Sequence, residues 1–243
     1  MDSTNLTNDE RTAINKGRWF STLSPSLRHD IIRCAFVKRF EDNALIAARG
    51  DPPEQWFGCA KGAVKVSSIS ISGKQITLTY IEPGIWFGDV SIFDGEQRTH
   101  DTYAHGETSL LCVAIADFQK ILASHSELYV ALLRLHARRI RQLFGLVEDL
   151  NTLPLRARLA KQILHLVRSY GVPSLSDTTE TRIGLQLAQE ELAQLLGASR
   201  QRVNQELKIL ERENSIRIEA GGLVVRSREI LMRVIQSNHV KGE

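Results

Sequence analysis

Apolar residues near the carboxyl end recur at the spacing of two short helices. In the sequence LAQEELAQLLGASRQRVNQELKIL, from Leu187 to Leu210, leucines recur at helical spacing on both sides of Gly197. Glycine suits the positive φ of a tight turn between helices. Ser199 can act as N-cap of the second helix, because its hydroxyl can accept a hydrogen bond from a backbone N–H one turn further on. The pattern predicts a helix-turn-helix.

The second of these helices has one apolar side and one polar side. With a rotation of about 100° per residue, the apolar side carries Val203, Leu207 and Leu210. It can pack on the first helix, whose apolar residues are Leu192, Leu195 and Leu196, with the small Ala193 allowing close approach. For LAQEELAQLLG alone, an ordinary helical hairpin with a solvated polar face is the better interpretation; the SRQRVNQ segment favours DNA binding.

The polar side of the second helix carries groups that can bind base edges and phosphates. Arginine can donate two hydrogen bonds to guanine, and glutamine or asparagine can pair with adenine in the same way. We expect Arg200, Gln201 and Gln205 to read bases, Arg202, Asn204 and Lys208 to lie nearer the phosphates, and Ser199 to begin this surface. Downstream, IRIEAGGLVV from Ile216 to Val225 predicts a β-hairpin with its turn at Gly221 and Gly222, so the unit is expected to be winged.

The amino-terminal part of the chain shows a different pattern. Residues 1–16 are polar, and we expect them to be weakly ordered, whereas Trp19 to Phe36 predicts short helices. Residues 37–116 contain short stretches of β-branched and aromatic residues between glycines, including Ala63–Ile69 and Gln75–Ile81 with a hairpin turn at Ser72-Gly73. This spacing is typical of an antiparallel sandwich or small barrel.

Residues 127–151 are predicted to form one long helix. Leu133, Ile140 and Val147 recur at intervals of seven, and His136, Leu143 and Leu150 fill the intermediate positions. This heptad seam favours pairing of two copies, and the alternative is a helix buried against its own β domain. We expect His136 to pack or to form hydrogen bonds.

Three domains are expected from these patterns. They are an effector-binding domain with a helical lead-in over residues 1–126, a dimerisation helix over 127–153 and a DNA-binding domain over 154–243. Pro154 is predicted at the first position of the helix that follows the boundary. That helix is expected over Arg156–Tyr170, and the segment GVPSLSDTTETR after it is expected to be a polar connection.

Composition and charge narrow the function classes. The chain has 243 residues, 42% of them hydrophobic, and a net charge of +3. The charge is −1 over residues 1–154 and +4 over 155–243, which supports phosphate attraction at the carboxyl end. Acidic residues in the first twenty positions and the lack of a long apolar run predict no signal peptide and no membrane span, hence a cytoplasmic protein.

The sequence lacks the motifs that usually mark a catalytic or metal-binding site. Cys34, Cys59 and Cys112 lie far apart and are expected to be free thiols, and the histidines have no metal-binding spacing. No nucleophile motif brings serine, histidine and aspartate together, so an enzyme is not expected. The segment GIWFGDVSIFDGEQRTHDT, from Gly84 to Thr102, could bind an anion through a glycine turn, a short helix and an arginine, although such loops are usually only surface structure.

Together, the glycine-punctuated β region, the GDVSIFDGEQRT stretch, the long helix and SRQRVNQELKILE resemble the CRP/FNR superfamily of bacterial transcription regulators. The resemblance implies an α+β fold, with an antiparallel, jelly-roll-like cyclic-nucleotide-binding β-roll, a dimerisation helix and a winged helix-turn-helix. Gly88 and Asp89 match the pair that holds a ribose hydroxyl, and Arg98 and Thr99 match the pair that binds the cyclic phosphate. The implied effector-binding residues are Gly88, Asp89, Val90, Ser91, Arg98, Thr99, Arg139 and Leu143.

Several positions depart from the cyclic AMP receptor. Asp89 is one methylene shorter than the usual glutamate, and Leu143 and Phe144 replace hydroxyl residues that face adenine. Arg98 and Asp101 also form an RxxD pattern that is used for guanine dinucleotides. Cyclic di-GMP and cyclic AMP therefore remain alternative effectors, and no permanent cofactor is expected.

The leading hypothesis is a homodimeric regulator that binds a near-palindromic double-stranded DNA site under allosteric control, with RNA polymerase as a further partner. Its two reading helices would lie roughly 34 Å apart. One alternative is a nucleotide sensor whose carboxyl-terminal module docks a protein, and another is a family member that needs no effector.

Overall fold

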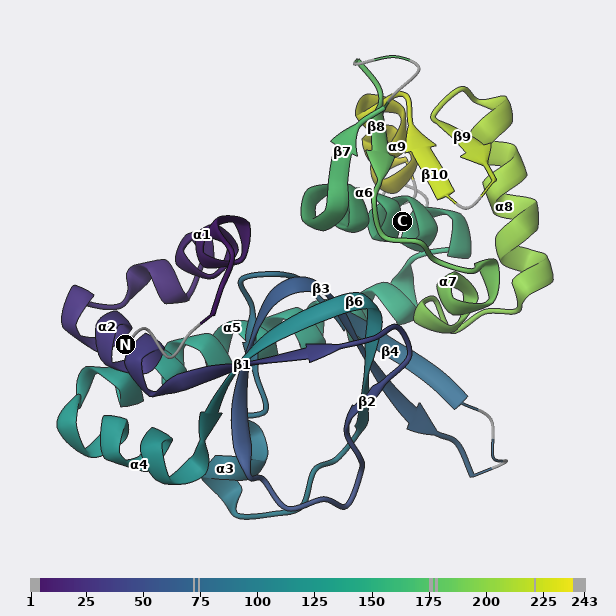
Figure 1. The fold of residues 1–243 in the computed structure, drawn as a ribbon. Helices are drawn as coiled ribbons and strands as arrows, with labels where there is room; N and C mark the ends of the chain where they lie inside the picture. Colours follow the sequence, from purple (N-terminus) through teal and green to yellow (C-terminus); the bar gives the residue numbers. More distant parts are fainter. Residues whose placement is uncertain are drawn as a thin grey trace. The chain divides into compact units, whose positions relative to one another are not determined.

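The computed structural model describes residues 5–71, 73, 75–174, 177, 179–220 and 222–237. The chain forms two compact units, residues 1–140 and 141–243. The longest helix, α5 (Glu127–Thr152), confirms the predicted long helix and runs through the boundary between the units (Figure 1).

The first unit is built on an antiparallel sheet. Its central strands are ordered β1-β6-β3-β4, while β2 pairs with β6 and β5 pairs with β3 (Figure 1). The strands are β1 (Ala35–Phe40), β2 (Leu45–Ala47), β3 (Gln55–Ile69), β4 (Gln75–Ile81), β5 (Trp86–Phe87) and β6 (Asp101–Ala114). The register between β3 and β6 shifts twice, and such bulges increase the local bend and twist of a sheet. The predicted antiparallel β-roll is confirmed.

The strand β3 is much longer than the predicted Ala63–Ile69. Its first half, from Trp56 to Ala60, is buried without interruption, so it lacks the alternation that marks a half-exposed strand in sequence. The strand β4 has the predicted bounds, Gln75–Ile81. In the predicted turn, Gly73 has φ +77°, and Ser72 lies outside the described residues.

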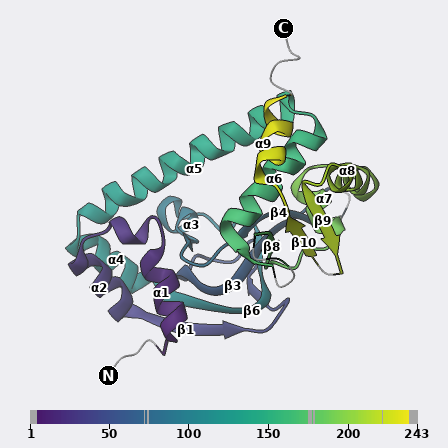
Figure 2. The same ribbon diagram turned by 90° about the horizontal axis from the view of Figure 1, so that it is seen from above.

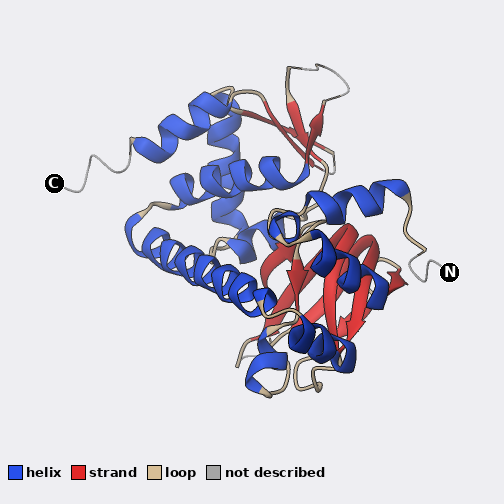
Figure 3. Cartoon of the chain, turned by 90° about the vertical axis from the view of Figure 1, so that its left-hand side faces the viewer, coloured by secondary structure: helices blue, strands red, loops and turns tan. Residues whose placement is uncertain are grey.

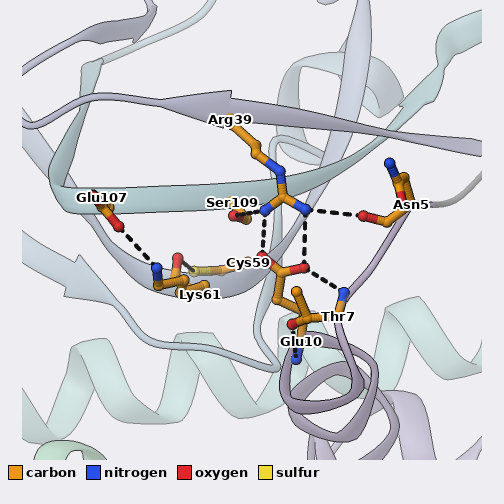
Figure 4. Close-up of polar contacts among 8 residues, drawn as sticks. All are labelled: Asn5, Thr7, Glu10, Arg39, Cys59, Lys61, Glu107 and Ser109. Atoms are coloured by element: carbon orange, nitrogen blue, oxygen red, sulfur yellow. Dashed lines mark hydrogen bonds and ion pairs between the residues drawn. The ribbon is translucent and has the colours of Figure 1, made fainter.

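The expectation of weak order at the amino terminus is wrong for the helix α1 (Asn8–Lys16). Thr7 caps this helix in a capping box with Glu10, because the Thr7 hydroxyl accepts from the Glu10 N–H and the Glu10 carboxylate accepts from the Thr7 N–H. Arg39 of β1 then donates two hydrogen bonds to Glu10, at 2.6 and 3.3 Å, and one to Ser109 (Figure 4). The helix is thus fixed to the sheet by a buried carboxylate.

Helices and aromatic rings cover one end of the roll. The helices α2 (Pro25–Cys34) and α4 (Ile115–Ser124) lie at the same end as α1 (Figures 1 and 2), and η1 (Phe20–Thr22) precedes α2. Beneath them lie Trp19, Trp56 and Trp86, with ring centroids 5.7 Å apart for Trp19–Trp56 and 4.2 Å apart for Trp56–Trp86. The Trp19 indole N–H donates to the Ala131 carbonyl at 3.0 Å, which ties this end to α5.

The five aliphatic residues of the α5 heptad seam are exposed, whereas His136 is half-buried. Leu133 and Val147 are 71% and 56% exposed, and Leu143 is 62% exposed. The opposite side, with Leu128 and Leu132, is buried. Within the first unit, the seam residues Leu133 and Ile140 are therefore not buried against the β domain, as the alternative to a paired helix would require.

The second unit combines helices with a small sheet. Its helices are α6 (Leu155–Tyr170), α7 (Gln189–Leu195), α8 (Arg200–Arg212) and α9 (Arg228–Gln236), drawn in blue in Figure 3. Its sheet, in red, has the antiparallel order β7-β8-β10-β9, formed by β7 (Gly171–Pro173), β8 (Thr181–Ile183), β9 (Ile216–Glu219) and β10 (Gly222–Val225).

Three local expectations for this unit need correction. The polar connection after α6 contains β7 and β8, because Thr181 and Arg182 pair with β10 and give the hairpin a third strand. Gly222 pairs with Glu219 inside the hairpin and is not a turn residue, while Gly221 lies outside the described residues. Pro154 is the N-cap of α6 and precedes its first helical residue.

Candidate functional site

The helix-turn-helix is formed by α7, a turn and α8. Gly197 has φ +59°, a left-handed conformation that glycine adopts without the penalty of a side chain. The Ser199 hydroxyl accepts from the Arg202 N–H at 3.3 Å, as the sequence predicted for an N-cap. From α6, the Arg158 guanidinium donates to the Leu196 carbonyl at 2.9 Å and so fixes the end of α7.

The two sides of α8 differ as expected. Val203, Leu207 and Leu210 are at most 1% exposed, and Leu192 and Leu196 of the α7 region are also buried. Asn204 is half-buried, and the other six predicted contacts are exposed, namely Ser199, Arg200, Gln201, Arg202, Gln205 and Lys208. A rigid helix therefore presents a continuous polar surface whose side chains are accessible from outside.

A network of ion pairs that sequence reasoning missed supports the wing. Glu180, only 6% exposed, accepts a hydrogen bond from Arg226 Nε and forms an ion pair with Arg217, each at 2.9 Å. Glu211 of α8 accepts from the Ile218 N–H at 2.9 Å, so the hairpin is bonded to the reading helix. The sequence gives little signal for this network, because its members are separated by irregular intervals.

A second candidate site lies where β5 leads into the short helix α3 (Val90–Asp94). Gly88 has φ +86°, and a Cβ there would lie 2.9 Å from an Arg98 nitrogen, so the glycine lets Arg98 approach the backbone. The Arg98 guanidinium donates to the Gln55 carbonyl at 2.6 Å and lies 5.2 Å from the Phe57 ring centre. Burial lowers the pKa of Arg98 from its usual value.

Asp89 is fully buried beside Arg98's loop and is bound by the long helix. Arg139 donates to both carboxylate oxygens, at 3.2 and 3.0 Å, and His136 Nε2 lies 3.0 Å from Oδ2. Burial alone would raise the pKa of Asp89, but the hydrogen bond with His136 and the charge of Arg139 together lower it. Asp89 is therefore held as a carboxylate, and His136 is the partner that sequence reasoning did not assign to it.

The remaining predicted effector residues are placed as follows. Val90 is exposed, while the buried Ser91 donates to the Gln97 carbonyl at 3.3 Å. The exposed Thr99 hydroxyl lies 2.7 Å from His100 Nδ1. Asp101, the end of the RxxD pattern, accepts from the Arg49 N–H at 2.8 Å. Leu143 belongs to the second unit, so the first unit brings together every predicted effector residue except this one.

The described residues offer little for metal, membrane or thiol chemistry. It contains no group of three or more histidine, cysteine, aspartate or glutamate side chains able to hold a metal ion. No helix within these residues is long and apolar enough to cross a membrane. Cys59 and Cys112 are buried free thiols, and burial raises the pKa of each to about 12, so neither is a reactive thiolate at neutral pH.

The two parts of the chain that carry these candidate sites match known domain families. Residues 37–125 match the cyclic nucleotide-binding domain, and residues 157–234 match the Crp-like helix-turn-helix domain. The CRP-like cAMP-activated global transcriptional regulator of Mycobacterium tuberculosis is 31% identical over 194 residues, which cover 80% of this chain and 85% of that protein. The global nitrogen regulator of Nostoc sp. is 30% identical over 199 residues, covering 81% and 88%.

A solved structure shows the same fold. The structure of the c-di-GMP responsive global regulator CLP of Xanthomonas campestris has a TM-score of 0.70 at 16% identity, and the match covers 84% of this chain and all of that one. These relatives are regulators and not enzymes. The chain therefore belongs to the CRP/FNR superfamily of DNA-binding transcription regulators, with a cyclic nucleotide-binding domain followed by a Crp-like helix-turn-helix.

Proposed function

We propose that the chain acts as a homodimer that reads a near-palindromic DNA site with one α8 helix in each half-site. The observation that carries this proposal is the exposed polar side of α8, opposite the buried Val203, Leu207 and Leu210. Helix-turn-helix dimers place such helices in successive major grooves, about 34 Å apart. The exposed α5 seam supplies an apolar surface of the kind that pairs long helices.

Within α8, Arg200, Gln201 and Gln205 are the proposed base readers. All three are exposed and lie near the amino-terminal end of the helix, which is the part that usually contacts base edges. Arg202 and Lys208 would bind phosphates, together with Asn204.

Substitution of Arg200 tests the assignment of the readers. Arg200→Ala should remove most of the preference for the operator over random DNA, about 1–3 kcal/mol per half-site, with little loss of nonspecific affinity. Arg212→Ala removes an exposed arginine at the far end of the same helix and should leave the preference intact. Gel shifts with matched and scrambled duplexes measure both; an unchanged preference in Arg200→Ala would exclude Arg200 as a reader.

For the roll, we propose a cyclic nucleotide effector whose phosphate binds at Arg98. The Arg98 guanidinium donates hydrogen bonds to the backbone carbonyls of Gly88 and Gln55. Among the described residues, no carboxylate forms an ion pair with it, so its positive charge is available to a phosphate. The relative from Mycobacterium tuberculosis is cAMP-activated, and the CLP regulator is c-di-GMP responsive. Either nucleotide offers the phosphate that Arg98 would bind.

A specific observation favours a second candidate, a regulator that needs no effector. Asp89, which matches the ribose-binding position of the family, is already bound by Arg139 and His136. A ribose hydroxyl would have to displace a charged hydrogen bond to reach the carboxylate, which weakens the gain from binding. The direct bond from Asp89 to α5 would then hold the helix in place without a ligand.

Calorimetric titration distinguishes the two candidates. Cyclic AMP, cyclic GMP and cyclic di-GMP are titrated into the full chain, into Arg98→Ala and into Arg138→Ala, whose arginine is an exposed neighbour of Arg139. An effector should bind the full chain and Arg138→Ala, and lose about tenfold or more in affinity with Arg98→Ala. If none of the three binds while operator DNA is still bound, the effector-independent candidate is the correct one.

A further inference from the structure

A cleft between α1 and α2, far along the sequence from the effector residues, has the composition of a ligand site. Its volume is about 230 Å³. Leu6, Ile14 and Ile32 contribute an apolar lining, and Arg11, Arg28 and His29 contribute nitrogen donors. No aspartate or glutamate is among the residues that line it. The cleft thus combines an apolar lining with nitrogen donors, one of which is the positively charged guanidinium of Arg28.

Arg28 is the lining residue that indicates a missing hydrogen-bond acceptor in the cleft. Its Nε is buried, and no residue in the described ranges accepts a hydrogen bond from it. A buried donor without an acceptor costs about 1–3 kcal/mol, and such groups in native proteins are usually satisfied by water, an ion or a ligand. The neighbouring Arg33 differs, because it forms an ion pair with Asp30 at 3.4 Å.

We propose that this cleft binds a small carboxylate with an apolar tail. A planar guanidinium matches a carboxylate geometrically and is the side chain that pairs with it most specifically. The apolar lining would take the tail, and the volume is below the range of about 300–1,000 Å³ that holds drug-sized ligands, so the molecule must be small.

The position of the cleft gives such binding a consequence for the long helix. The helix α1 is fixed to the sheet through Glu10 and Arg39, so a ligand between the helices would brace α2 against a fixed wall. The segment between them carries Trp19, whose indole N–H is bonded to the Ala131 carbonyl of α5. A ligand in the cleft would therefore act on α5 through Trp19, and not through Arg98.

Calorimetry with sodium hexanoate as the probe and hexan-1-ol as its neutral counterpart tests the proposal. The full chain should bind hexanoate about tenfold or more tightly than the alcohol, and Arg28→Gln should lose that difference. Arg28→Lys keeps the positive charge but loses the planar guanidinium that can donate two hydrogen bonds to one carboxylate. This variant should bind hexanoate with intermediate affinity. Arg18→Gln, which removes an exposed arginine that does not line the cleft, should bind as the full chain does.

Two further measurements keep the outcome clear. Circular dichroism and thermal unfolding show whether each variant is folded, and Arg98→Ala shows which site is titrated. Hexanoate binding that survives Arg98→Ala and is lost in folded Arg28→Gln supports the cleft. Absence of binding to the full chain, or equal binding by folded Arg28→Gln, overturns the proposal without affecting the effector or DNA assignments.

Discussion

Glu10 and Asp89 are both buried carboxylates, and each is held by an arginine from another element. Glu10 joins α1 to β1 through Arg39, and Asp89 joins the loop before α3 to α5 through Arg139. Removing either arginine would leave a buried charge without its partner, which is more damaging than removing the whole pair. These residues therefore fix helices to the roll, in addition to any role in binding.

The Glu10 pair predicts a dependence of stability on acid. Burial would raise the pKa of Glu10, but hydrogen bonds from Arg39, Ser109 and the Thr7 N–H lower it from 4.5 to about 2. Because the folded-state pKa is depressed, the contribution is complete above about pH 4.5 and is lost as the pH falls towards 2. Urea unfolding between pH 5 and 2, expected to show a loss of about 1–3 kcal/mol from this group, measures it.

The matched variant for this prediction is Glu10→Gln. It keeps the shape and loses the charge, so it should be less stable at neutral pH and show a shallower fall in acid. Asp9→Asn removes an exposed carboxylate from the same turn and should follow the full chain. A curve for Glu10→Gln that parallels the full chain throughout would contradict the assignment.

Single residues also show how far sequence reasoning reaches. Ser199 and Gly197 were predictable, because capping and positive φ are local properties of the residues themselves. The bond from His136 to Asp89 was not, because it joins positions far apart in sequence that only the folded roll brings together. The sequence indicated Asp89 and Arg139 as separate candidates, and it gave no sign of the contact between Asp89 and His136.

At the scale of elements, periodicity decided what could be predicted. Amphipathic α8 and the heptads of α5 were found with nearly correct bounds, since each has one apolar side. The three-residue strands β7 and β8 were missed because they are too short to show alternation. The helix α1 was missed although its Thr7-to-Glu10 capping box was present, because the polarity of the segment outweighed that local signal.

The exposed seam of α5 predicts that dimerisation depends on its apolar residues. Leu133→Glu would place a charge where two helices pair, at a cost of about 3 kcal/mol or more, and should shift the protein towards monomer. Arg138→Glu introduces the same residue outside the seam and should leave the dimer intact. Light scattering after size-exclusion chromatography measures the mass; a dimeric Leu133→Glu would place the interface elsewhere.

The whole molecule has an uneven charge, which matters for DNA binding. Residues 155–243 carry +4, against −1 over residues 1–154, so phosphate attraction should come from the helix-turn-helix domain. Operator affinity of the full chain should therefore fall steeply with salt. Lys208→Ala should reduce the slope of log affinity against log salt by about two for a dimer, one for each copy.

The control for the salt series is Arg212→Ala, which should change the slope little if the far end of α8 is clear of the phosphates. Filter binding over a range of potassium chloride concentrations gives the slopes. A salt-independent affinity, or no affinity for any duplex at low salt, would instead favour the alternative hypothesis, in which the carboxyl-terminal module docks a protein.

The aromatic packing of the roll has a practical consequence. All three tryptophans of the chain lie in a single cluster, and bonds from Trp19 to Ala131 and from Arg139 to the Trp86 carbonyl connect that cluster to α5. Tryptophan emission from the native protein must therefore originate beside α5. The native chain carries its own optical probe, and a rapid-mixing instrument could follow a displacement of α5 without any attached dye.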